Sequence, residues 1–207
     1  MPTTSPAMRW LARIPDAQRE ALRDAYATPP RAYHHFGHVE DVLAHCDDVF
    51  GVDGWHRPRE VLYAVLYHDA VYVPGRSDNE AKSARLAELH LRDQWPVDAI
   101  DVARVSELIL LTARHGTLTP DSAGDEDARR FLDCDMAILG ADPEAFAAYD
   151  RGIAEEYSAV PRWLYRRKRR QFFEALLASP RIFLSDLFHD RYDAAARRNL
   201  AERLAVR

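Results

Sequence analysis

The chain has 207 residues, of which 47% are hydrophobic and 29% are charged. This length and composition predict one soluble globular domain and argue against a disordered chain or a fibrous repeat. A formal net charge of -5 offers no general attraction to nucleic acid or to an anionic membrane. No apolar run approaches the roughly 20 residues that cross a bilayer, and the opening MPTTSPAMRW lacks the features of a secretory signal. We therefore expect a cytoplasmic protein that acts on a small molecule, with no nucleic acid or membrane as partner.

Apolar residues recur at helical spacing along the whole chain, and almost nothing has the pattern of a strand. In the first half, helices are expected over residues 16–26, 35–50, 58–67, 77–93 and 98–115. The segment VLYAVLY after Pro58 is apolar on every side, which predicts a central position for this helix. Residues 70–77 are expected as a loop, after which Ser77 and Glu80 have the spacing of a capping box.

The second half continues this pattern after a polar loop. The segment DEDARRFLDCDMAILG predicts a helix that ends at Gly140, another begins near Pro143, and two more follow Pro161. Cys46 and Cys134 form no CxxC pair and are expected as small buried side chains. With no linker and no internal repeat, we predict an all-α fold with one domain over residues 1–207. Its core is expected over about residues 30–200, with residues 1–29 as a peripheral N-terminal helix.

One carboxylate interrupts an expected apolar helix face. At about 100° per residue, Asp135 projects into the arc that contains Phe131, Leu132 and Met136, whereas Asp133 points to the opposite side. A carboxylate in such a place must be hydrogen-bonded, paired with a cation or bound to a metal. Asp135 is therefore a candidate ligand, and a buried cap or an arginine partner is the alternative.

Two further segments carry metal-ligand residue types. His68 and Asp69 follow the most apolar helix, where imidazole and carboxylate suit a divalent ion; a histidine favoured by the helix dipole beside a solvated aspartate is the alternative. In YHHFGH, His38 could share an ion with His34 four residues earlier or with His35 three residues earlier. His115, at the end of an apolar helix, remains a further candidate. The other histidines are expected to be solvated or structural: His45, His56, His90 and His189.

In this order, His38, the doublet His68-Asp69 and Asp135 resemble the pattern of the HD-domain superfamily of metal-dependent phosphohydrolases. The segments RAYHHFGHVEDVL, VLYHDAVY, SDNEAKSA, LTARH, LDCDMAILG and EEY resemble a compact bacterial branch of predicted phosphohydrolases over roughly residues 30–200. The resemblance implies a helical bundle of the HD-domain type, with His38, His68, Asp69 and Asp135 as ligands of one ion. Such a ligand set suits Mn²⁺, Fe²⁺, Co²⁺, Ni²⁺ or Zn²⁺.

The same resemblance implies a metal-dependent phosphohydrolase that cleaves a phosphoester or phosphoanhydride of a small phosphorylated metabolite, by analogy a nucleotide. Its catalytic residues would be Asp69, Glu80 and His115. Glu80 could orient the attacking water or only complete the capping box, because the chain lacks the glutamate that several such hydrolases carry soon after the doublet. His34 and His115 could support the ligands, contact the substrate phosphate or bind a second ion.

Phosphate also needs cationic partners, and the expected ones are Arg31, His34 and Lys82. The basic run Tyr165–Arg170 could also hold phosphate, but a solvated helix face is the expected reading. Two other functions remain open: a di-iron, O₂-using oxygenase of the same fold, and a catalytically silent metal-binding regulatory protein. The sequence leaves a homodimer open as well.

Overall fold

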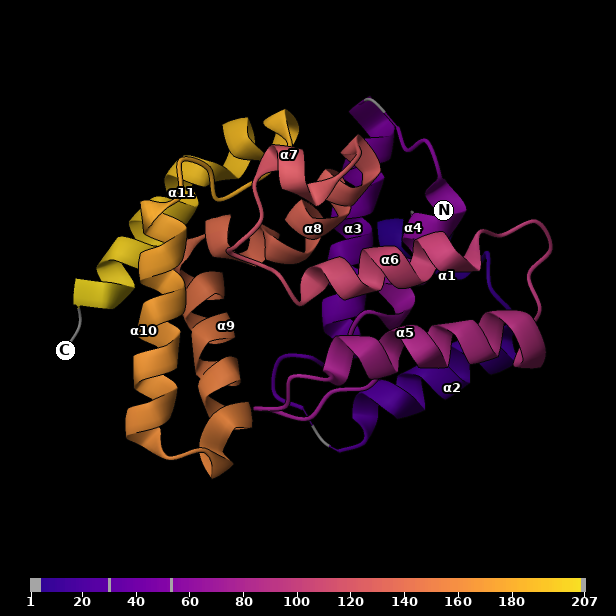
Figure 1. The fold of residues 1–207 in the computed structure, drawn as a ribbon, viewed down its shortest axis with the longest axis horizontal. Coiled ribbons are helices and arrows are strands. Elements are labelled where there is room, and N and C mark those ends of the chain that lie inside the picture. The colour runs from indigo at the N-terminus through magenta and orange to yellow at the C-terminus, as the bar shows by residue number, and fades with distance from the viewer. Residues whose placement is uncertain (1–4, 30, 53, 206–207) are drawn as a thin grey trace. The chain divides into compact units, whose positions relative to one another are not determined.

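The computed structural model describes residues 5–29, 31–52 and 54–205 (Figure 1). All regular elements within these ranges are helical, which confirms the predicted all-α class. The chain divides into two compact units, Met1–Ala113 and Arg114–Arg207. The HD-domain type and a single domain over the whole chain stay predictions. None of the helices in the described ranges combines the length and the apolar character that a membrane span requires.

The first unit corresponds to the helices predicted for the first half of the chain. Its elements are α1 (Pro6–Leu11), α2 (Asp16–Ala27), α3 (Phe36–Val52), α4 (Pro58–Tyr67), α5 (Asn79–Leu89), the π-helical η1 (His90–Gln94) and α6 (Val102–Thr112). Helix α1 was not predicted as a separate helix. Helix α6 begins later than predicted, because the side chain of Asp101 accepts a hydrogen bond from the Arg104 amide and caps the helix there.

Helix α4 lies at the centre of this unit, as its all-round apolar sequence predicts. Every side chain from Val61 to Tyr67 is buried, and α3, α5 and α6 all pack against the helix (Figure 1). The buried hydroxyl of Tyr67 accepts a hydrogen bond from Gln18 Nε2 at 2.9 Å and lies 2.9 Å from His90 Nδ1. Burial raises the pKa of Tyr67 well above its ordinary value, so this hydroxyl stays protonated.

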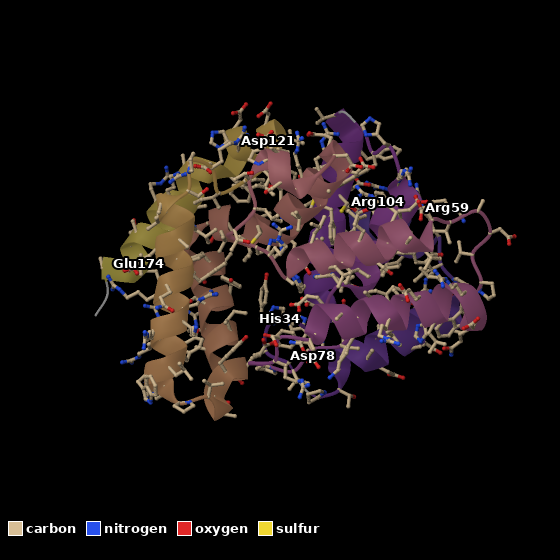
Figure 2. The ribbon with its side chains drawn as sticks, in the orientation of Figure 1. His34, Arg59, Asp78, Arg104, Asp121 and Glu174 are labelled. Atoms are coloured by element: carbon tan, nitrogen blue, oxygen red, sulfur yellow. The ribbon has the colours of Figure 1, made fainter. Side chains whose placement is uncertain are left out.

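The loop before α5 is held by side chains of that helix. Asn79 exchanges two hydrogen bonds with the main chain of Val73, and Ser83 does the same with Val71. The predicted capping box of Ser77 and Glu80 does not form, because the helix begins after Asp78. Asp78 lies at the start of α5 (Figure 2), where ion pairs hold its pKa well below the usual range.

The second unit contains the remaining elements. They are α7 (Pro120–Ala123), α8 (Glu126–Met136), the 3₁₀ turn η2 (Ala137–Gly140), α9 (Pro143–Glu156), the 3₁₀ turn η3 (Tyr157–Ala159), α10 (Arg162–Ala178) and α11 (Asp186–Ala205). The helix predicted to reach Gly140 thus ends as α8 and tightens into η2. Gly140 permits α11 to approach, because a Cβ there would lie 2.7 Å from the Cβ of Tyr192. From α11, Asn199 Nδ2 donates to the carbonyls of Leu139 and Ala141, both at 2.9 Å.

Asp133 anchors the beginning of α11. Its carboxylate accepts hydrogen bonds from the amides of Leu184 and Ser185, each at 2.7 Å, and from the Ser185 hydroxyl at 2.6 Å. Only 1% of the residue is exposed. Burial raises the pKa of Asp133 to about 7, while the hydrogen bonds from Ser185 and Leu184 act in the opposite direction. Asp133 is thus buried although it does not belong to the predicted apolar arc of its helix, because the segment before α11 covers it.

We predict that Asp133→Asn lowers the free energy of unfolding by about 1–3 kcal/mol, because one acceptor oxygen cannot satisfy the three donors and an unsatisfied buried donor costs about that much. Urea denaturation followed by circular dichroism measures the change. The control is Asp190→Asn, an exposed aspartate on α11, for which the expected change stays within about 0.5 kcal/mol. Equal stability of the two variants would contradict the anchoring role of Asp133.

Candidate metal centre

His38 is positioned by the first turns of α3. Phe36 begins the helix, and the ring of the exposed His35 accepts a hydrogen bond from the Gly37 amide at 3.0 Å. A Cβ on Gly37 would lie 2.6 Å from that ring, so the glycine leaves room for this cap. His38 itself is only 4% exposed and packs against Tyr33, with the ring centroids 4.9 Å apart. The sequence left two possible partners for His38, His34 and His35. The pair of His35 with His38 is disfavoured, because Nδ1 of His35 already accepts the hydrogen bond of the Gly37 amide at the start of the helix.

His68 and Asp69 end the buried helix α4. The amide of His68 makes the last helical hydrogen bond, to Ala64, whereas the Asp69 amide donates to the hydroxyl of Tyr26 at 3.2 Å. The carbonyl of Val65 is thereby free to accept from Nδ1 of His68, 2.8 Å away. This bond makes Nδ1 the donor and leaves a lone pair on Nε2.

Three ligand atoms converge within this unit. Nε2 of His68 lies 3.2 Å from Nε2 of His38 and 3.3 Å from Oδ2 of Asp69. Nε2 of His38 and Oδ2 of Asp69 are 4.0 Å apart. Ligand atoms about 2.1 Å from an ion and about 90° to 110° apart lie about 3.0 to 3.4 Å from each other. Two of the distances match neighbouring positions around one ion, and the third matches a wider angle. A buried His38–His68–Asp69 group can therefore hold a metal ion.

The remaining predicted residues of the first unit have different positions. His34 is labelled in Figure 2. Its Nε2 lies 3.9 Å from Oδ2 of Asp69, and the centroid of its ring lies 4.1 Å from that of Tyr72. Glu80 is half-buried on the first turn of α5. Lys82 forms an ion pair with Asp78 at 2.9 Å. His34 thus lies beside the ligand group, near the carboxylate of Asp69.

The guanidinium of Arg31 faces main-chain carbonyls, whereas the predicted phosphate contact would need it to face a substrate. Its Nη1 donates to the carbonyls of His34 and Asp69 at 3.0 and 2.6 Å, and its Nη2 donates to those of Ala25 and Ala70 at 3.0 and 3.2 Å. These four bonds use all the η N–H groups of the guanidinium. Arg31 therefore fixes the main chain on both sides of the site.

Asp135 and His115 lie in the second unit, where they meet each other. Nε2 of His115 is 2.8 Å from Oδ2 of Asp135, and the two side chains are 19% and 13% exposed. Asp135 is thus paired, as a carboxylate on an apolar helix face requires. Its place as the last metal ligand stays a prediction, and so does the catalytic role of His115.

The sequence analysis missed the groups that orient the ligands: the Val65 carbonyl, the Tyr26 hydroxyl and the Arg31 guanidinium acting on carbonyls. A signal for the first existed, because the last four carbonyls of a helix lack helical partners and a histidine just after the helix can reach one. No equivalent signal exists for Tyr26, since its contact with the Asp69 amide joins residues 43 positions apart. Comparisons of the chain with protein-family models, curated proteins and solved structures find no match.

We predict that the wild-type protein binds about one divalent ion per chain and that His38→Asn weakens this binding at least about tenfold, because it removes a ligand. Mass spectrometry of the metal content after dialysis against Mn²⁺, Co²⁺, Ni²⁺ or Zn²⁺ measures the loss. His45→Asn, on the same helix, is the matched control and should retain the ion. Retention by both variants would exclude the His38–His68–Asp69 group as the binding site.

Proposed function

We propose that the chain is a metal-dependent phosphohydrolase. The observation that carries this proposal is the convergence of His38 Nε2, His68 Nε2 and Asp69 Oδ2, each contributed by the part of the chain where the resemblance to HD-domain hydrolases places a ligand. The acceptors are buried and pre-oriented, which is the arrangement that a catalytic ion needs. Asp135 is part of the proposal as the last ligand.

The donor set defines the ion that would fit. Two imidazoles and a carboxylate, without a thiolate, suit Mn²⁺, Fe²⁺, Co²⁺, Ni²⁺ or Zn²⁺ better than Mg²⁺. When bound, such an ion lowers the pKa of water from 15.7 towards about 7 and stabilises charge on a phosphoryl group. A site with three protein ligands from the first unit also leaves positions for water and for a phosphate oxygen.

The chain's own residues hold and orient the reacting groups. The Val65 carbonyl fixes the ring of His68, and Arg31 fixes the main chain at Asp69. His34, close to the Asp69 carboxylate, can donate a hydrogen bond to a phosphate oxygen. In the reaction, a water oxygen bonds to phosphorus, the bond from phosphorus to the leaving oxygen breaks, and that oxygen takes a proton. We assign the orientation of the water to Glu80, with Asp69 and His115 as the other catalytic candidates.

For the substrate we propose a small phosphorylated metabolite, with a nucleotide as the first class to test. The resemblance alone supports the nucleotide, whereas the ligand group supports phosphate chemistry in general. A screen of nucleoside mono-, di- and triphosphates with added Mn²⁺, Co²⁺ or Ni²⁺ tests both. Released phosphate or pyrophosphate identifies the bond that breaks.

We predict that Asp69→Asn lowers the rate of phosphate release more than about 100-fold, because loss of a ligand should exceed the 10- to 100-fold effect of losing a supporting residue. Asp135→Ala should lose both metal and activity, and His45→Asn should keep both. Stoichiometric metal without hydrolysis of any phosphoester would favour the regulatory alternative. Two irons per chain with a visible absorption band, and no phosphate release, would favour the oxygenase.

We predict that Glu80→Gln lowers the rate about 100-fold or more while the metal content stays at the wild-type level, since a positioned base contributes about 10²- to 10⁴-fold. Steady-state kinetics beside metal analysis separates the two quantities. Ser77→Ala is the control, because the structure shows no capping box and this change should affect neither. An unchanged rate in Glu80→Gln would move the role to another residue.

A further inference from the structure

The second unit contains a pocket of about 430 Å³ formed by α10 and α11, and basic side chains dominate its wall. The lining includes Tyr165, Arg166, Arg169, Arg170, Phe173 and Arg203. The run Tyr165–Arg170 is expected as a solvated helix face, and four of its six residues are indeed exposed. The same run also lines a concave site, whose volume is in the range of small-molecule pockets, about 300–1,000 Å³.

A single buried carboxylate orients two of these arginines. Asp150 on α9 is 5% exposed, and its two oxygens accept from Nε of Arg169 at 3.1 Å and from Nε of Arg203 at 2.5 Å. Because both bonds use Nε, the η N–H groups of Arg203 remain for another acceptor, whereas the Arg169 side chain also hydrogen-bonds to Tyr149. Nη2 of Arg169 is buried and has no hydrogen-bond partner within the described ranges.

Aromatic rings surround the Arg169 guanidinium. Its central carbon lies 4.4 Å from the ring centroid of Phe173 and 4.8 Å from that of Tyr149. The hydroxyl of Tyr165 is buried as well and has no hydrogen-bond partner among the described residues. Burial raises the pKa of Tyr165, so the group stays a hydroxyl that can donate. The pocket thus combines two buried donors, Nη2 of Arg169 and the Tyr165 hydroxyl, with the more exposed guanidinium groups of Arg166 and Arg203.

The charges of the pocket do not balance. Four guanidinium groups line it, whereas the acids paired with them are Asp150 and Glu174, the latter 2.8 Å from Arg170 on the exposed side of α10 (Figure 2). Arg166 forms no ion pair in the part of the chain that the structure describes. Two positive charges remain, one of them on the exposed Arg166, so the pocket is an electropositive site. An anion with about two negative charges would balance them.

We propose that this pocket binds the phosphate group of a small phosphorylated ligand. Nη2 of Arg169, the η N–H groups of Arg203 and the Tyr165 hydroxyl donate to the phosphate oxygens, and Arg166 supplies further charge. Arginine forks match phosphate oxygens in pairs, and a phosphate dianion matches the two excess charges. The site is a second ligand site, built from different residues than the His38–His68–Asp69 group, and it needs no metal.

Isothermal titration calorimetry with inorganic phosphate and pyrophosphate, in the presence of EDTA to prevent hydrolysis, tests the proposal. Arg166→Gln should weaken pyrophosphate binding at least about tenfold, because it removes a charged donor. Arg167→Gln changes the neighbouring arginine, which does not line the pocket, and should weaken binding less than about twofold. Arg203→Gln should weaken binding as well, while Asp69→Asn should leave it unchanged, which separates this site from the metal centre.

Three results would overturn the proposal: a dissociation constant above about 1 mM for both phosphate and pyrophosphate, equal weakening by Arg166→Gln and Arg167→Gln, or loss of binding in Asp69→Asn. Binding of a single-stranded RNA oligonucleotide without binding of pyrophosphate would overturn it too. If Arg203→Gln fails to fold because Asp150 loses a partner, Arg166→Gln still decides, since no ion pair of the described structure depends on Arg166.

Discussion

A helix that is buried on every side and ends in an imidazole sets the chemistry of the first unit. His68 is 1% exposed, so water cannot satisfy its two ring nitrogens and the protein must do so. The Val65 carbonyl accepts a hydrogen bond from Nδ1 of His68, and this bond directs the lone pair of Nε2 toward His38 and Asp69. A proton shared with His38 or a cation held by all three residues can then satisfy Nε2. The burial of α4 therefore produces a site in which acceptors face one another.

Both units use charged side chains to satisfy main-chain groups that helices leave without partners. In the first unit the cation of Arg31 donates to four carbonyls around the doublet. In the second unit the carboxylate of Asp133 accepts from two amides just before α11. Each charge matches the type of group exposed there, since donors at a helix start need an acceptor and carbonyls need a donor. In the sequence such charged side chains resemble ligand-binding residues, although in the structure they stabilise the main chain.

Local patterns predicted the helices well, because periodicity, prolines and capping residues act over a few positions. The central place of α4 followed from its apolar sequence, and the order of histidine and aspartate segments predicted which residues meet in the first unit. The helical wheel that singled out Asp135 did not predict the burial of Asp133, for a physical reason. A helical wheel assumes one buried side, whereas the chain before α11 buries Asp133 from another direction. The pocket of the second unit was missed likewise, since Asp150 and Arg203 are 53 positions apart.

The two proposed ligand sites differ in their hydrogen-bonding groups: one consists of acceptors and the other of donors. This difference limits what each can bind. The first collects lone pairs, from two imidazoles and a carboxylate, so it attracts a cation and repels a phosphate. Two of the predicted phosphate-binding cations are already engaged, because Arg31 donates to main-chain carbonyls and Lys82 pairs with Asp78. The pocket of α10 and α11 collects donors and attracts an anion unaided. In the proposed reaction, a cation held by the His38–His68–Asp69 group would therefore offset this repulsion, which makes the ion the condition for the proposed phosphate chemistry.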